Sequence, residues 1–254
     1  MKKAGGAWRN GACVALLLFA LPAGAEETVR RFYGYAYDAQ SGAYAYTEVH
    51  AQRIVDGRWH GGSIDYYAPD GTELGHKTMS LGDDPYVVRY RMDMRGGYGS
   101  AISDSGDPIV VTRTEGGRTD SARIAKVAPT CADAGFHLFL RDHFAQLQAG
   151  ETLRFQLVAA QRLASYKFRA MKVGEDRFEG RPVVVIRLEP DSLLRVFAGT
   201  VEMRYAPDER ELMAFRGPSN VVNPATGKPF DVRVVYATRK PADAPRELPP
   251  LQGS

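Results

Sequence analysis

The stretch "YVVRYRMDM", Tyr86 to Met94, decides the fold class of this chain. Large apolar side chains stand at alternate positions in it, with Arg89, Arg91 and Asp93 between them. Successive side chains of a β-strand point to opposite faces, so one face of this strand is apolar and the other is charged. The stretch therefore predicts a half-buried strand of an antiparallel sheet.

Similar stretches follow one another along the chain, from Arg30 to about Lys126 and again after Leu153. Turn signals separate them: Asp56-Gly57 and Gly116-Gly117 are typical of tight hairpins, and Pro69-Asp70-Gly71 is typical of a β-turn. A meander of this length must curl, close or split into layers. We predict an all-β, mainly antiparallel fold, in which a curled sheet forms a barrel or half-barrel.

The stretch "CADAGFHLFLRDHFAQLQAG", Cys131 to Gly150, breaks the strand pattern. Its apolar residues recur at helical spacing, and Gly150 stands where a helix C-terminal cap belongs. The pattern predicts one helix, Gly135 to Gln148, packed centrally against the curled sheet as a plug or lid. The apolar stripe of this helix comprises Phe136, Leu140, Phe144 and Leu147.

The first 25 residues have the layout of a secretory signal peptide. Basic residues precede a short apolar run, and Ala23-Gly24-Ala25 is a small-residue cleavage site. The run is too short to span a membrane, and no later stretch of the sequence is long and apolar enough to do so as a helix. We expect cleavage after Ala25 and a periplasmic protein. The expected organisation is a signal peptide at 1–25, a single β-rich domain at 26–239 and a disordered proline-rich tail at 240–254.

The charge balance and the sequence motifs argue against several classes of protein. Three of the 33 basic residues lie in the signal peptide, so the mature chain carries 30 basic and 30 acidic residues, which argues against a nucleic-acid binder. The motifs of serine hydrolases, zinc proteases and nucleotide-binding loops do not occur in the sequence. We therefore expect no cofactor and no metal. Cys131 is the one cysteine beyond the signal peptide, and we expect its thiol to be buried.

The split between an apolar strand face and a basic strand face suggests a ligand with a tail and a head. Tyrosines and the helix would hold the apolar tail, and arginines borne on strands would meet an anionic head. The leading hypothesis is therefore a non-enzymatic periplasmic protein that binds a lipid or other amphiphile. Its candidate ligand-binding residues are Arg89, Arg91, Arg154, Arg169, Tyr86, Tyr90, Phe139, Leu140 and His143.

Two alternatives stay open. The first is a structural or interaction protein of the cell envelope, with a filled core and an envelope protein as its partner. The second is a hydrolase that uses the region from His137 to His143, which requires His137, Arg141, Asp142 and His143 to converge in a cleft.

The layout resembles exported bacterial proteins of unknown function that are built as long antiparallel meanders. It is also similar to the half-barrel proteins of lipoprotein localisation in the Gram-negative periplasm. The signal peptide, the hairpin "YYAPDGTELG" (Tyr66 to Gly75) and a helix set against a curled sheet carry this resemblance. The half-barrel proteins have their main helix near the mature N-terminus, whereas here it is central. The resemblance implies binding of an apolar or lipid ligand without catalysis.

Overall fold

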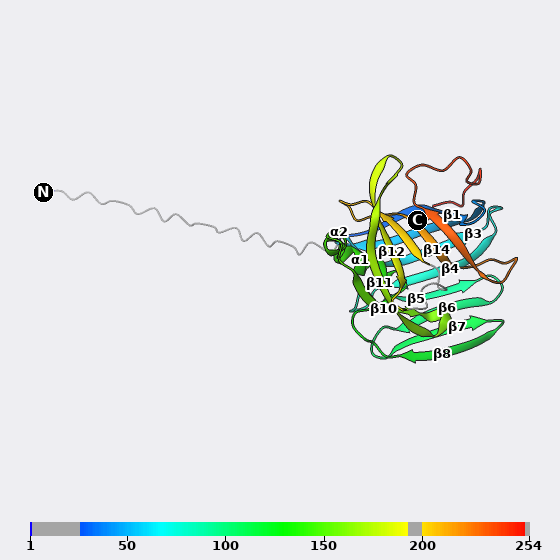
Figure 1. Ribbon diagram of the computed structural model, residues 1–254, viewed down its shortest axis with the longest axis horizontal. Coiled ribbons are helices and arrows are strands. Elements are labelled where there is room, and N and C mark those ends of the chain that lie inside the picture. Colours follow the sequence, from blue (N-terminus) through cyan, green and yellow to red (C-terminus); the bar gives the residue numbers. More distant parts are fainter. Residues whose placement is uncertain (2–25, 193–199, 252–254) are drawn as a thin grey trace.

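The structure is a computed structural model that describes residues 1, 26–192 and 200–251. The predicted signal peptide therefore lies, apart from Met1, outside the described residues. Fifteen strands form one curled sheet among the described residues (Figure 1), which confirms the predicted all-β, mainly antiparallel fold class. The first eight are β1 (Glu27–Asp38), β2 (Tyr44–Val55), β3 (Arg58–Tyr67), β4 (Glu73–Ser80), β5 (Arg89–Met94), β6 (Tyr98–Asp104), β7 (Ile109–Glu115) and β8 (Arg118–Ile124). The others are β9 (Thr130–Ala132), β10 (Leu153–Ala159), β11 (Ala164–Phe178), β12 (Arg181–Pro190), β13 (Val201–Tyr205), β14 (Leu212–Val222) and β15 (Pro229–Val235).

The sheet consists of two meanders joined at the chain's first and last strands. β1 to β8 lie side by side in sequence order, β9 to β15 do the same, and β1 pairs with β15 in antiparallel register. β8 and β9 are therefore the two edge strands. The curl brings the β9 edge back to the start of β5: Ala132 of β9 forms a parallel bridge with Val87, just before β5. The short 3-10 helix η1 (Ala160–Arg162) contacts β6 and β7. The result is a curled, barrel-like sheet, with β6 to β8 continuing beyond the seam.

β5 has the alternation that its sequence predicts. Tyr90, Met92 and Met94 are buried, whereas Arg89 and Arg91 are exposed. The inner face continues through the register onto the neighbouring strands, since Met92 lies opposite Lys77 of β4 and Ser100 of β6. Two apolar clusters fill the space inside the curl. The first cluster is formed mainly by the inner faces of strands β1 to β8. The second lies between strands β10 to β13 and the helical segment, and it includes the buried Cys131.

The helical segment forms two helices rather than the single one predicted. α1 (Gly135–Asp142) and α2 (Phe144–Gln148) are separated at His143, whose backbone leaves helical geometry at φ −102° and ψ 20°. The ring Nδ1 of His143 lies 2.8 Å from the carbonyl oxygen of Phe139. The backbone N–H of His143 donates to the same carbonyl at 3.1 Å, so the hydrogen-bonded chain of turns continues from α1 into α2 across the break.

The helices cover one end of the curled sheet. Arg210, in the turn between β13 and β14, donates a hydrogen bond to the carbonyl of Arg141 at 3.1 Å. Because β14 runs the length of the sheet, the turn between β14 and β15 lies at the opposite end. Figure 1 shows α1 and α2 together at the left of the molecule, and the orange β14–β15 turn at the right. In the described part of the chain, no helix is long and apolar enough to cross a membrane.

The close contact between Gly135 and the β4–β5 connection yields a test of this packing. A Cβ at Gly135 would lie 2.0 Å from the carbonyl oxygen of Tyr86, which is a backbone atom and cannot rotate away. We expect Gly135→Ala to lower the free energy of unfolding by about 1–3 kcal/mol, measured by urea denaturation. Gly174→Ala is the matched control, because nothing lies within 4 Å of its Cβ position. Equal unfolding midpoints for the two variants would contradict this packing.

Candidate functional site

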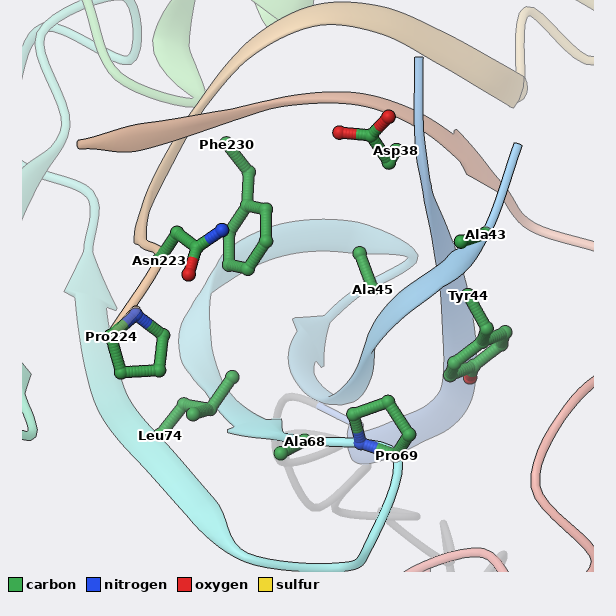
Figure 2. A pocket seen from close by; sticks show the side chains of 10 residues that line it. All are labelled: Asp38, Ala43, Tyr44, Ala45, Ala68, Pro69, Leu74, Asn223, Pro224 and Phe230. Carbon is green, nitrogen blue, oxygen red and sulfur yellow. The ribbon is translucent and has the colours of Figure 1, made fainter. Parts of the chain in front are cut away.

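The end of the sheet opposite the helices carries a hollow of about 320 Å³. Three turns surround it: β1–β2, β3–β4 and β14–β15. Figure 2 shows Ala45 near the middle of the hollow, with Phe230, Pro224, Leu74 and Pro69 around it. The mouths of curled sheets and barrels are common ligand sites, and this volume is at the low end for such sites. The full lining is Asp38, Ala43, Tyr44, Ala45, Ala68, Pro69, Leu74, Asn223, Pro224 and Phe230.

The polar side chains that line this hollow accept hydrogen bonds from backbone N–H groups of the surrounding turns. Oδ1 of Asp38 accepts hydrogen bonds from the backbone N–H of Gln40 at 3.1 Å and of Ser41 at 2.7 Å. These bonds, the one from Ser41 first, hold the pKa of Asp38 below its usual range. Asn223 Oδ1 likewise accepts the N–H of Ala225 at 2.9 Å. Eight of the ten lining residues have apolar or aromatic side chains, so the hollow presents chiefly these groups to a ligand.

Two aromatic side chains, Tyr44 and Phe230, line the hollow, and buried tyrosines support Phe230 from behind. The ring of Phe230 packs on buried Tyr46 at 5.6 Å between centroids, and Tyr46 meets Tyr66 edge to face at 6.1 Å. The Tyr46 hydroxyl lies 2.7 Å from Oγ of Ser219, so its polar atom is satisfied. The packing of Phe230 on Tyr46 gives the lining of the hollow a firm aromatic support.

A buried polar group lies further along β2. Nε2 of His50 is 2.8 Å from Oε2 of Glu48, and the Tyr236 hydroxyl donates to the same oxygen at 3.3 Å. Phe32 stacks on the imidazole at 4.5 Å. The carboxylate reaches this position because residue 34 is glycine: a Cβ there would lie 2.5 Å from Oε2. The inner face of the sheet is therefore not uniformly apolar.

An ion pair links the sheet interior to the start of the helical segment. Nζ of Lys77 lies 2.6 Å from both carboxylate oxygens of Asp133, and the two side chains are only 6% and 3% exposed. The ammonium also lies 4.9 Å from the ring centroid of Tyr90. Asp133 precedes α1 and has a positive φ of 49°. A buried charge that lost its partner would be costly, so this pair fixes where α1 begins.

His137 of α1 lies close to this pair. Its Nδ1 is 2.7 Å from the hydroxyl of Tyr205. Burial lowers the pKa of His137 to about 4, and the nearby Asp133 carboxylate opposes that shift only in part. Burial also raises the pKa of Tyr205 well above its usual value. Both groups are therefore neutral at physiological pH, and they hold the helix to β13 through a neutral hydrogen bond.

The four candidate arginines lie on the outer face of the sheet, away from the hollow. Arg91 pairs with Asp93, and Arg154 pairs with Asp191. Arg169 pairs with Glu189, while Arg89 is exposed on β5. Tyr90 points to the inner face, so it cannot share a contact surface with the arginines that flank it. The structure brings Arg154 and Arg169 together as direct cross-strand neighbours.

The remaining candidates pack together at the helical end. The ring of Tyr86 meets Phe139 edge to face at 5.4 Å, and its hydroxyl donates to Asp142 at 2.9 Å. Phe139 and Leu140 are buried in the cluster between the helices and the sheet, and His143 contacts the Phe139 ring at 4.4 Å. These four residues fill the interface, and none of them lines the hollow at the opposite end.

The polar side chains of the helical segment have separate partners. His137 contacts Tyr205, His143 contacts the Phe139 carbonyl and Asp142 accepts from Tyr86. This arrangement does not provide the convergent cleft that the hydrolase hypothesis requires. Among residues 26–192 and 200–251, no three His, Cys, Asp or Glu side chains gather in a way that could hold a metal ion.

Sequence reasoning missed the hollow and the buried ion pair. The hollow is built from turn residues that are far apart in sequence, and their meeting follows only from the register of the strands. Lys77 carried a weak signal: it shares its strand face with Gly75 and Met79, whose neighbours on the sheet are buried. Asp133 stands just before α1, where an aspartate commonly caps a helix, but its carboxylate binds Lys77.

Comparison with solved structures supports the fold. The chain is similar to a crystal structure described as a beta-barrel-like protein of domain of unknown function DUF1849 from Brucella abortus. The match has a TM-score of 0.52 at 7% identity and covers 82% of this chain and 95% of that one. At this identity the likeness concerns the fold alone: this chain resembles an uncharacterised bacterial beta-barrel-like protein. No protein-family model and no curated protein matches the sequence.

Removal of Lys77 tests the buried ion pair. We expect Lys77→Met to lower the free energy of unfolding by about 3–5 kcal/mol, because Asp133 would be left charged and buried. The double variant Lys77→Met with Asp133→Asn should lose less than Lys77→Met alone, since it removes both charges. Arg91→Ala, at a pair 73% and 60% exposed, is the control and should cost under about 1 kcal/mol. An equal loss for Lys77→Met and Arg91→Ala in urea denaturation would contradict this role.

The depressed pKa of His137 yields a pH prediction. Below about pH 6.5 the unfolded chain takes up a proton on this imidazole, whereas the folded chain does so only near pH 4. The contribution of His137 to the free energy of unfolding is therefore fully present above pH 6.5 and is lost as the pH falls towards 4. We expect the unfolding free energy of the wild type, relative to His137→Gln, to fall by about 2 kcal/mol between roughly pH 7 and pH 4.5. Parallel stability curves for the two proteins would refute the assignment.

Proposed function

We propose that this protein is an exported, periplasmic binding protein that takes a lipid or other amphiphile without catalysing a reaction. The observation that carries the proposal is the difference between the two ends of the curled sheet. One end is covered by α1 and α2, and the other opens into a largely apolar hollow lined by Tyr44 and Phe230 among others. The signal-peptide pattern of the first 25 residues supports export.

The location of the site differs from the one suggested by the sequence. The apolar part of the ligand enters the hollow beside Ala45, Leu74 and Phe230, while the interface around Phe139 and Leu140 stays closed. A volume of about 320 Å³ suits the end of an acyl chain rather than a whole lipid. The head group then remains outside the turns. This mode of binding also fits the resemblance to the half-barrels of lipoprotein localisation.

A second function is supported by the filled interior. Tyr46, Met92, Leu140 and Tyr205 are among the large side chains that are completely buried inside the curl. A protein with such an interior can act in the envelope through its outer surface, as a structural or interaction protein. Under this alternative the hollow would receive an apolar side chain of a protein partner instead of an acyl chain.

Native mass spectrometry of the mature protein, purified from the periplasm without detergent, tests the lipid proposal. We expect the wild type to carry a lipid-sized mass that is lost on denaturation. Ala45→Phe should abolish this mass, because the larger side chain fills the hollow. Ala237→Phe is the matched control, since Ala237 lines a different hollow on the outer face and its variant should keep the ligand.

Two results would contradict the proposal. A ligand-free wild type would favour the interaction protein, and pull-down of an envelope partner would then be the next experiment. Loss of the bound mass in Ala237→Phe but not in Ala45→Phe would place the ligand elsewhere. Circular dichroism of both variants must first show that the fold is kept.

A further inference from the structure

The outer face of β1 carries a row of tyrosines. Tyr33, Tyr35 and Tyr37 stand at alternate positions, on the face opposite Gly34 and Ala36. On the same face, Tyr35 and Tyr37 form an apolar cluster with Ala214 of β14 and Val235 of β15. An aromatic patch of this kind on the outside of a sheet is a typical site of protein contact when it is uncovered.

The chain's own C-terminal segment covers this patch. Residues 240–251 read "KPADAPRELPPL" and contain four prolines. Composition predicted disorder for 240–254, and the described residues 240–251 lie against the tyrosine row. Ala244 is buried in the apolar cluster, and Leu248 packs against it. We refer to residues 240–251 as the proline-rich tail.

Two hydrogen bonds anchor the tail to one strand. The hydroxyl of Tyr37 donates to Oδ1 of Asp243 at 2.9 Å, and the hydroxyl of Tyr33 donates to the carbonyl of Pro249 at 2.6 Å. Between these two anchors the tail forms a loop, and Lys240 holds it, since its Nζ donates to the carbonyls of Pro245 and Arg246. Two tyrosines four residues apart on β1 thus bind one carboxylate and one proline carbonyl of the tail.

These contacts use the chemistry of proline-rich peptide recognition. Proline-rich segments lose little conformational entropy on binding, have free carbonyls and dock on aromatic surfaces whose hydroxyls donate to those carbonyls. A hollow of about 400 Å³ lies beside the tail, lined by Tyr37, Phe178 and Arg233 among others. The guanidinium of Arg233 lies over the Tyr37 ring at 4.8 Å, so a cation flanks the carboxylate site.

A tethered segment can occupy a surface through weak contacts, because its effective concentration is high. A segment of another chain that binds the same surface more tightly can then displace the tethered one. We propose that the outer face of β1 is a recognition surface for an extended proline-rich, carboxylate-bearing segment of another protein, and that the tail occupies it in the absence of that partner.

A labelled peptide with the sequence of residues 240–251 tests the proposal on the full chain by fluorescence anisotropy. In the variant Asp243→Ala with Leu248→Ser, the tail loses an anchor and its packing, while all fifteen strands keep their sequence. We expect this variant to bind the peptide about tenfold more tightly than the wild type. Trypsin should also cleave after Arg246 faster in the variant, which reports release of the tail.

Matched changes on the surface and in the peptide complete the test. Adding Tyr33→Phe and Tyr37→Phe to the tail variant should remove the tenfold gain, and so should replacement of the peptide's prolines by alanine. Equal peptide affinity in the wild type and the tail variant would overturn the proposal, provided that cleavage shows the tail released. Undiminished binding after the tyrosine changes, or a doubled mass of the wild type through exchange of tails between two copies, would overturn it as well.

Discussion

The pairing of β1 with β15 is the constraint on which the rest of this structure depends. It joins two meanders that would otherwise be separate sheets, through the register that sets Tyr35 opposite Val235 and Ala36 opposite Val234. These strands are far apart in sequence, so their pairing must overcome a large loss of chain entropy. Once it forms, the inner faces of both meanders point into one space, and the curl brings Ala132 to Val87.

The two ends of the curled sheet then differ because of what the connections contain. At one end the connection between β9 and β10 is long enough to form α1 and α2, and the buried pair of Lys77 and Asp133 fixes their position. At the other end the turns around the hollow are short and are held by their own Asp and Asn side chains. Short turns leave Phe230 and Tyr44 lining an open hollow, which makes this end the candidate for binding.

Local patterns were sufficient to predict the strands and the helical segment, because side-chain alternation in stretches such as Arg89 to Met94 reports burial directly. They did not predict the break at His143, because the change is confined to the backbone angles of one residue while the apolar stripe continues from α1 into α2. The candidate site could not be predicted from local sequence patterns, because its residues are far apart in the sequence. Asp38, Leu74 and Phe230 meet only through strand register, and the outer-face arginines could not be seen to have carboxylate neighbours until strands were placed side by side.

The central claim is that the open end of the curled sheet receives the apolar part of an amphiphile, while the helical end stays closed. The most direct measurement is NMR of the folded protein with labelled aromatic side chains, titrated with dodecanoate below its micelle concentration. Binding at the open end should give saturable shifts of the Tyr44 and Phe230 resonances and leave those of Phe139 and Phe144 unchanged. Shifts confined to Phe139 and Phe144 would instead show that the ligand enters beneath the helices, and would contradict the account.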